Sequence, residues 1–308
     1  MIGAPLVATS CPLCGASAAK VVIAVADPFV AADVEFPIGE CASCGLARTL
    51  AGPNEAERKT WYSRHYGAFL AEAHRRQGRL RRLWQKITNM HPYDILSRMP
   101  SSGRLLEVGC GDGILLQSMA RRAQRAVGVE PDPGSAARAR SRGLCVVSGN
   151  IEDFDAGTEK FDHVLFGFVL EHLADPVGTL LRARSWLAPG GRVHVFCPDY
   201  ESPFKEELGK HWQLWHVPYQ RVFFSAKTLA ATLAKAGLRT LSMKHYTRGG
   251  VLALGESLAA GSRGIVPRTG RLHELKNRLR GIAASRAGKG DCLAATATAA
   301  QDPGVETR

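Results

Sequence analysis

Short apolar runs alternate with segments of helical spacing through the middle of the chain. The apolar runs span residues 104–108, 126–129, 144–147, 161–166 and 192–196, and two more follow at 238–245 and 291–297. Helical spacing occurs at 114–123, at 133–142 and from about residue 175 onward. This alternation predicts an α/β domain with a mostly parallel, doubly wound sheet that binds ligands at the carboxyl ends of its strands.

A glycine-rich turn joins the first of these strands to the first helix. Gly109-Cys-Gly-Asp-Gly113 follows Val108 directly, and such a turn lets a ligand approach bare main-chain amides at a helix N-terminus. The GxGxG spacing differs from the GxGxxG of dinucleotide-binding folds, so NAD is the weaker interpretation. Glu130 ends the second strand, where a carboxylate can accept hydrogen bonds from both hydroxyls of a ribose.

Two CxxC pairs precede this domain. Cys11 and Cys14 are separated from Cys41 and Cys44 by 26 residues, and a glycine follows each pair. Two such knuckles can bring four thiolates together in the tetrahedral arrangement that zinc prefers, and four protein ligands indicate a structural site. Disulfide pairing and a redox CxxC are the disfavoured alternatives. The other four cysteines are expected to be small core residues: Cys110, Cys145, Cys197 and Cys292.

The composition places the chain among globular proteins. Of its 308 residues, 45% are hydrophobic and 22% are charged, which is enough apolar material for a full core and excludes disordered or collagen-like classes. No window approaches the roughly 18 apolar residues of a spanning helix. Residues 1–10 lack the features of a signal peptide, so a soluble protein in the reducing cytoplasm is expected.

The net charge of +12 is concentrated in two segments. Residues 58–86 carry nine basic residues and one acidic residue, and residues 248–289 carry nine and two. Both segments predict amphipathic helices. The first aligns Arg75, Arg79, Arg82 and Lys86 beside an apolar set within 69–87, and the second sets Leu272, Leu275, Leu279 and Ile282 against Arg271, Lys276, Arg278 and Arg280. Such a stripe of charge can simply be a face exposed to solvent. Alternatively it can bind an anionic membrane surface that holds a lipid-linked substrate, a phosphorylated acceptor or, less favoured, RNA.

Several motifs, taken in order, resemble the class I S-adenosylmethionine (SAM)-dependent methyltransferases. They are Leu105-Leu-Glu-Val-Gly-Cys-Gly-Asp-Gly113, Val129-Glu130, Gly149-Asn150, Phe161-Asp162, Glu171-His172-Leu-x-Asp-Pro176 and Leu187-Ala-Pro-Gly-Gly191. The resemblance covers roughly residues 103–237 and implies a Rossmann-like, seven-stranded sheet that binds SAM.

The resemblance also implies where the cofactor lies. Glu107, Gly109 and Gly111 would line its methionine end, Glu130 would hold the ribose, and Asn150 with the amide of Ile151 would meet the adenine, where many relatives have Asp. The complete expected set is Glu107, Gly109, Cys110, Gly111, Gly113, Glu130, Pro131, Asn150, Ile151 and Phe168.

The front end resembles bacterial enzymes that methylate sugars and other biosynthetic small molecules. These enzymes combine two cysteine knuckles, a segment like Trp61-Tyr62-x3-Tyr66 and a methyltransferase core. Deoxysugar C-methyltransferases share the knuckles but usually carry a further C-terminal domain, for which this chain has no room. This difference counts against methylation of a carbon atom.

The acceptor site is expected above the fourth strand and the insert that follows the fifth. His172, with Glu171, is the candidate general base for a hydroxyl, and the alternative is that the pair only orders the cofactor loop. The aromatic residues of the insert would stack on a sugar ring or form a small local core, while the two linker tyrosines would close over the acceptor or pack the linker. The candidate acceptor residues are Tyr62, Tyr66, Asp199, Tyr200, His211, Trp212 and Trp215.

The sequence thus predicts a zinc-ribbon-like domain at 1–52, a basic helical linker at 53–100 and a SAM-binding domain at 101–300. The basic insert at 248–289 precedes its last strand, and 301–308 is a loose tail. The predicted activity is SAM-dependent methyl transfer to a small-molecule hydroxyl of a sugar, polysaccharide or natural-product precursor. The alternatives are an RNA methyltransferase and a non-catalytic SAM-binding partner subunit, and the oligomeric state is left open.

Overall fold

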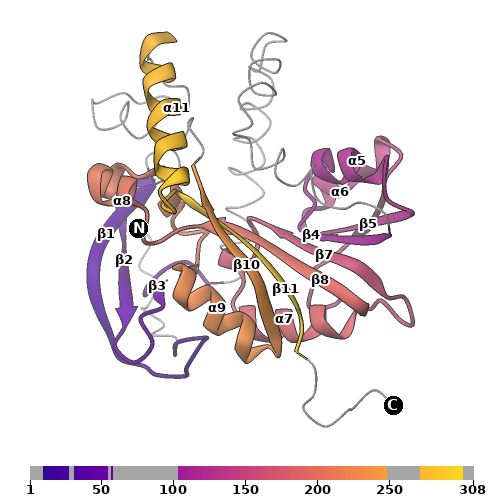
Figure 1. The fold of residues 1–308 in the computed structure, drawn as a ribbon. Coiled ribbons are helices and arrows are strands. Elements are labelled where there is room, and N and C mark those ends of the chain that lie inside the picture. The colour runs from indigo at the N-terminus through magenta and orange to yellow at the C-terminus, as the bar shows by residue number, and fades with distance from the viewer. Residues whose placement is uncertain (1–9, 28–30, 55–56, 58–102, 248–270, 301–308) are drawn as a thin grey trace.

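The computed structural model describes residues 10–27, 31–54, 57, 103–247 and 271–300 (Figure 1). Within these residues the strands form two sheets, one of seven strands and one of four. Tyr62, Tyr66, the basic helix expected within 69–87, the first part of the basic insert and the tail at 301–308 lie outside the described residues.

The seven-stranded sheet has the order β10-β11-β8-β7-β4-β5-β6. Its strands are β4 (Arg104–Val108), β5 (Arg125–Glu130), β6 (Cys145–Ser148), β7 (Phe161–Gly167), β8 (Leu187–Pro198), β10 (Leu238–Tyr246) and β11 (Cys292–Ala299). β11 runs antiparallel to both of its neighbours, and the pairings among β6, β5, β4, β7 and β8 are parallel. The predicted mostly parallel, doubly wound sheet is confirmed.

Helices cover both faces of this sheet. α5 (Ile114–Ala120) and α6 (Pro133–Ser141) bury Leu115, Met119 and Ala139 in one core cluster. α7 (Pro176–Ser185) and α9 (Ala226–Lys235) bury Leu180 and Leu233 in the other. Because the strands between them are apolar on both sides, they read in the sequence as continuous hydrophobic runs.

Helix starts follow local capping chemistry. The Asp175 side chain accepts a hydrogen bond from the Gly178 amide at 2.8 Å, and Pro176 stands at the first position of α7. Ser225 and Thr228 form a capping box at the start of α9. These caps fix where the chain leaves the carboxyl edge of the sheet and turns back across its face.

The N-terminal sheet has the order β1-β2-β3-β9. It consists of β1 (Ala19–Asp27), β2 (Ala31–Cys41), β3 (Ala47–Thr49) and β9 (Val222–Phe223), all paired antiparallel. The first three strands belong to the region predicted as a zinc ribbon, but β9 comes from the methyltransferase part of the chain. The two parts therefore share a sheet, and Figure 1 shows the small sheet next to α8 (Pro203–Leu208) and α9.

Three predictions about local structure need correction. The Pro189-Gly-Gly191 segment, expected as a turn before a strand, lies within β8. The first helix ends at Ala120, three residues before its predicted end. Cys145 is exposed, whereas Cys110, Cys197 and Cys292 are buried as predicted, because Cys145 begins β6, which is the edge strand of the sheet among the described residues.

The remaining elements are short helical turns and one long helix. The short turns are η2 (Leu170–His172), η3 (Gly209–His211) and η4 (Gln213–Trp215), and the long helix is α11 (Arg271–Arg286). Among the described helices, none is both long enough and apolar enough to cross a membrane.

Candidate active site and four-cysteine centre

Four neighbouring strands end at one edge of the large sheet and bring most of the predicted site residues together. The strands lie in the order β8-β7-β4-β5. Asp199 comes directly after β8, Phe168 after β7 and Gly109 after β4, and Glu130 is the last residue of β5. Because these strands are mutually parallel, their carboxyl ends share one edge. The structure thus collects in one place residues that are up to 90 positions apart in the sequence.

The glycine loop after β4 adopts a backbone that only glycine tolerates well. Gly109, Gly111 and Gly113 have φ values of 68°, 53° and 73°. A Cβ on Gly109 would lie 2.5 Å from Cγ2 of Val169, so the loop packs directly against the segment that follows β7. The loop therefore presents bare backbone on its other side, as predicted from the GxGxG spacing.

Glu130 ties this loop to the end of β5. Its Oε2 accepts a hydrogen bond from the Gly111 amide at 2.8 Å, and its Oε1 accepts one from the Asp132 amide at 2.9 Å. Burial raises the pKa of Glu130, while these two amide hydrogen bonds oppose that rise. A carboxylate oxygen can accept more than one hydrogen bond, so the group can still meet ribose hydroxyls.

Glu107 carries a buried carboxyl oxygen without a hydrogen-bond partner. The residue is only 4% exposed, and its Oε2 has no partner among the described residues. Burial, together with the charge of Glu130, raises the pKa of Glu107 well above its ordinary value. Since an unsatisfied buried polar atom is costly, a donor such as the amino group of SAM would fit beside Glu107, whose cofactor role stays a prediction.

Phe168 has a strained backbone at the end of β7. Its φ of 61° is unusual for a bulky residue, and its amide donates to the Phe196 carbonyl at 2.8 Å. Strain of this kind persists at sites where the surroundings fix an unfavourable conformation. It turns the chain sharply between the sheet and the η2 turn that carries Glu171 and His172.

The other predicted cofactor residues lie around the same edge. Cys110 is buried beneath the glycine loop, and Ile151 is buried beyond β6. Pro131 is exposed directly after Glu130. Asn150 is exposed, and its side-chain amide donates to Asp153 at 3.2 Å. The cofactor role of each of these residues stays a prediction.

His172 is held by a main-chain carbonyl. Its Nδ1 lies 3.0 Å from the carbonyl oxygen of Tyr219. A carbonyl can only accept, so Nδ1 must carry the proton, and in the neutral ring Nε2 then holds the lone pair. This is the tautomer that a general base for a hydroxyl needs. Glu171 is buried beside it, and its carbonyl accepts from the Arg221 amide at 2.9 Å.

The aromatic insert favours the local-core alternative over an open acceptor wall. Trp212 is 1% exposed and packs edge-on against Trp215, with ring centroids 5.2 Å apart. Trp215 in turn packs on Phe223 at 5.4 Å. The hydroxyl of Tyr200 donates to Glu40 at 2.7 Å, so it joins the small sheet to the large one. Of the two alternatives for Trp212 and Trp215, the burial of their rings favours the local core, and an acceptor role for them stays a prediction.

The two polar candidates of this insert differ in their surroundings. His211 is half-buried at the end of η3. Asp199 is buried, and its Oδ2 lies 2.7 Å from Nδ1 of His245 on β10. Burial raises the pKa of Asp199, and the hydrogen bond to His245 opposes that rise. Sequence reasoning did not single out His245, because one polar residue near the end of an alternating strand resembles a solvated position.

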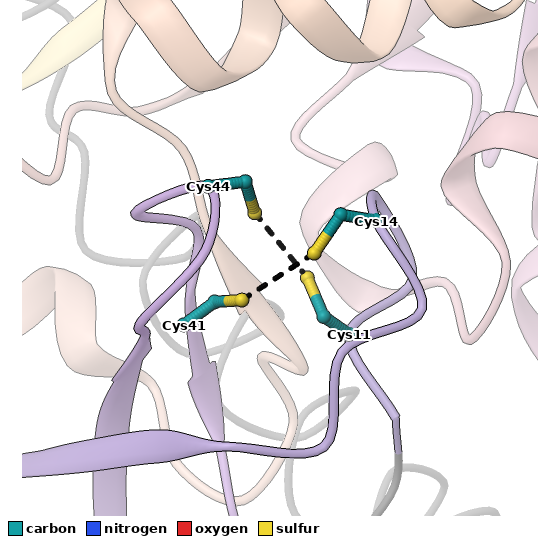
Figure 2. A group of neighbouring side chains, drawn as sticks. All are labelled: Cys11, Cys14, Cys41 and Cys44. Atoms are coloured by element: carbon teal, nitrogen blue, oxygen red, sulfur yellow. Dashed lines mark hydrogen bonds between the residues drawn. The ribbon is translucent and has the colours of Figure 1, made fainter.

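The four cysteines of the two knuckles converge on one point (Figure 2). The Sγ atoms of Cys11 and Cys44 are 3.5 Å apart, as are those of Cys14 and Cys41. All four sulfurs lie within 4.8 Å of one another, and none forms a disulfide. Sulfurs placed tetrahedrally about 2.3 Å from zinc would be roughly 3.8 Å apart, so the arrangement fits a four-thiolate zinc site.

The knuckles also explain their glycines. The amides of Gly15 and Gly45 donate to the carbonyls of Cys11 and Cys41 at 2.8 and 2.9 Å. The two glycines have φ values of 81° and 78°, a left-handed backbone that favours glycine. Burial acts to raise the pKa of Cys41, but amide hydrogen bonds from Cys44 and Ser43 bring it down to about 6. Burial raises the pKa of Cys44 to about 12. A full set of four thiolates therefore requires a cation among the sulfurs.

The small sheet connects the cysteine centre to the candidate base. The Thr49 hydroxyl donates to the Gln220 carbonyl at 2.7 Å, and the Thr49 amide donates to the Arg221 carbonyl at 3.0 Å. Arg221 and Tyr219 then hold Glu171 and His172 through the main-chain contacts already described. Sequence reasoning missed this path, because nothing in the sequence pairs residue 49 with residue 220.

The ribbon has one internal brace and one further contact with the rest of the protein. Arg48 is buried, and its Nη2 donates at 3.1 Å to the carbonyl of Ser17, which also belongs to the ribbon and lies beyond the first knuckle. The ammonium of Lys235, at the end of α9, donates to the Leu13 carbonyl within that knuckle. The cysteine centre is thus part of the same packed body as the large sheet.

A seven-stranded Rossmann-like sheet with this glycine loop and these edge carboxylates defines a SAM-dependent methyltransferase. A family model described as "Methyltransferase domain" matches residues 73–243, more than half of the sequence, and the chain belongs to this family. Membership of this family supports SAM as the methyl donor.

Curated relatives share part of the chain. A ubiquinone biosynthesis O-methyltransferase from Cereibacter sphaeroides is 35% identical over 144 residues, which is 44% of this chain and 58% of that protein. One from Azorhizobium caulinodans is 38% identical over 110 residues, which is 33% of this chain and 44% of that protein. The chain therefore spans less than two thirds of the length of the relatives that it matches.

Solved structures support the fold. A structure described as a SAM-dependent methyltransferase, possible histamine N-methyltransferase, from Thermotoga maritima superposes with a TM-score of 0.50 at 23% identity. The match covers 76% of this chain and 97% of that chain. At this identity the likeness concerns the fold alone.

Proposed function

We propose that this enzyme transfers a methyl group from SAM to a hydroxyl oxygen of a small molecule, with His172 as the general base. The observation that carries the proposal is the hydrogen bond between Nδ1 of His172 and the Tyr219 carbonyl, which leaves the lone pair on Nε2. The relatives are named as O-methyltransferases, which agrees with a hydroxyl acceptor.

When bound, SAM supplies an electrophilic methyl group on a sulfonium. With SAM bound, Nε2 of His172 would accept the hydroxyl proton while the acceptor oxygen displaces the sulfonium sulfur from the methyl carbon. The glycine loop and Glu107 would hold the methionine end, Glu130 the ribose, and Asn150 with Ile151 the adenine. Positioning of the two reactants would supply much of the rate, since the reaction needs an in-line approach.

Two classes of acceptor are candidates, and one experiment distinguishes them. The resemblance of the cysteine knuckles favours a hydroxyl of a sugar, polysaccharide or natural-product precursor. The named role of the relatives in ubiquinone biosynthesis favours a phenolic hydroxyl. Incubating the enzyme with methyl-labelled SAM and matched panels of sugars, phenols, amines and RNA tests both arms, because the label reports which class accepts the methyl group.

The outcome of this panel decides the proposal. Label on the oxygen of a sugar or a phenol supports it and names the class. Label on RNA, with strongly salt-dependent binding, would replace it with the nucleic-acid alternative. If the protein does not bind SAM in calorimetry, both the small-molecule and the RNA methyltransferase proposals are wrong.

The same proposal assigns zinc to the four cysteines as a structural ion. Cys11, Cys14, Cys41 and Cys44 would occupy all four positions of the metal, which leaves no open position for chemistry. We place the enzyme in the cytoplasm, where reducing conditions keep such thiols free to bind a metal.

A further inference from the structure

The long helix α11 turns an apolar stripe away from the protein. Its leucines are spaced three and four residues apart, so they share one side of the helix. They are largely exposed, with Leu272 at 81%, Leu275 at 43% and Leu279 at 58%. An amphipathic helix on a globular protein normally packs its apolar side against the core. In α11 the apolar side faces away from the core.

Polar contacts hold the other side of the helix against the protein. Asn277 is completely buried, and Gly281 one turn later is also buried. The guanidinium of Arg280 forms an ion pair with Glu207 and lies 5.7 Å from the ring centroid of Phe204, both on α8. These contacts fix how α11 is rotated about its axis, and the outward leucines follow from them.

Charge identifies the partner. Residues 271–289 carry six basic residues and one acidic residue, a net charge of +5, and Lys276 and Arg286 are exposed on the leucine side. A second copy of the chain would bring the same positive charge to the contact and would be repelled. Leucines flanked by basic residues on one helix face are the chemistry of a helix that lies in the surface of an anionic membrane.

The C-terminal end of α11 lies close to the candidate active site. α11 is followed by Asp291, whose carbonyl accepts from the Asp199 amide at 2.7 Å, and Cys292 pairs with Pro198 at the end of β8. The base of the helix therefore stands at the sheet edge that carries the candidate active site. Figure 1 shows α11 rising beyond the ends of β10 and β11.

We infer that α11 docks this protein on the surface of an anionic lipid bilayer, with Leu272, Leu275 and Leu279 inserted among the lipids and Lys276 and Arg286 at the headgroups. The helix has 16 residues and lies on the membrane without crossing it. This inference does not depend on which hydroxyl is methylated, because it concerns where the enzyme works.

Vesicle co-sedimentation of the full-length protein tests the inference. The wild type should sediment with vesicles of phosphatidylcholine mixed with phosphatidylglycerol and should stay in solution with phosphatidylcholine alone. The double variant Leu272→Asp/Leu279→Asp should lose at least about tenfold in binding, because it removes two inserted side chains and adds negative charge. Leu279→Ser alone should give an intermediate loss.

A matched control separates this effect from a general one. Leu181 on α7 is 46% exposed and lies outside the stripe, so Leu181→Asp should bind the mixed vesicles like the wild type. Melting temperatures of the α11 variants should stay close to that of the wild type, since most of the surface of Leu272 and Leu279 is exposed. Failure of the wild type to bind the mixed vesicles overturns the inference, as does equal binding by the double variant. A wild-type dimer that the double variant abolishes in light scattering would assign the stripe to self-association instead.

Discussion

The hydroxyl of Thr49 donates a 2.7 Å hydrogen bond to the carbonyl of Gln220, 171 residues away in the sequence. Thr49 ends the strand that follows the second cysteine knuckle, and Gln220 lies next to the residue whose carbonyl holds His172. The contact joins a metal-type centre to a candidate base through a few main-chain steps. The N-terminal ribbon is therefore in contact with the segment that holds the candidate base.

Removing this hydroxyl should slow methyl transfer without weakening cofactor binding. Thr49→Val leaves a buried carbonyl unsatisfied, which costs about 1–3 kcal/mol, and lets the segment 219–221 shift. We expect kcat to fall about tenfold while the SAM dissociation constant in calorimetry stays within twofold of the wild type. Thr49→Ser keeps the donor and should restore most of the rate. A Thr49→Val enzyme with wild-type kcat would show that the ribbon only stabilises.

Gly109 should not tolerate a side chain. An added Cβ would lie 2.5 Å from Val169, and the φ of 68° is unfavourable for any other residue. Gly109→Ala should therefore weaken SAM binding by at least about tenfold, because the loop must move. Gly143 shares the left-handed backbone, with φ of 79°, but has open space around it, so Gly143→Ala measures the strain alone. Equal SAM affinities in the two variants would contradict the role of the loop.

The four-cysteine centre should contain one zinc ion per chain by elemental analysis. Cys41→Ser should release the metal and lower the melting temperature by about 5 °C or more, because metal binding contributes directly to folding. The exposed Cys145, which lies outside the cluster, provides the control, and Cys145→Ser should leave both the metal content and the melting temperature unchanged. Identical melting curves for the two variants, or a zinc-free wild type, would refute the assignment.

A buried histidine pair should make the fold sensitive to acid. His163 and His194 lie 3.1 Å apart between β7 and β8, and His194 also contacts Thr296 at 3.1 Å. Burial lowers the pKa of His194 to about 3, with His163 and Arg192 adding to the effect, and burial also lowers the pKa of His163. The unfolded chain, whose histidines titrate near about 6.5, then binds more protons than the folded one.

Stability should accordingly be highest above about pH 6.5 and decline as the pH falls toward about 3. Between about pH 7 and pH 5 we expect a loss of about 2 kcal/mol from one such histidine, seen as a lower urea midpoint. His194→Gln should reduce this acid-induced loss, whereas His211→Gln, outside the pair, should keep it. If both variants lose the same stability in acid, the His163–His194 pair is not the cause of that loss.

Much of the large sheet follows from the sequence. Every predicted strand of that sheet was found within two residues of its expected ends, apart from β8, because buried parallel strands appear as continuous apolar runs. The glycine loop and the two knuckles were equally visible, since left-handed glycines and paired cysteines have local geometric requirements.

The missing parts depend on contacts between distant segments. β9 has only two residues and therefore no periodicity, yet it completes the N-terminal sheet. The partner of Asp199, His245, lies 46 residues away and carries no local signal. The spacing in α11 predicted an amphipathic helix, but only the packing of Arg280 on α8 shows that its leucines face outward.

The central claim is that His172 takes the proton of an acceptor hydroxyl during methyl transfer from SAM. The most direct measurement is the single-turnover rate of the wild type and of His172→Ala with methyl-labelled SAM and the best acceptor from the panel. We predict label on oxygen, a rate at least about a hundredfold lower in the variant and an unchanged SAM dissociation constant. A variant rate within twofold of the wild type, or label on nitrogen, carbon or RNA, would contradict the claim.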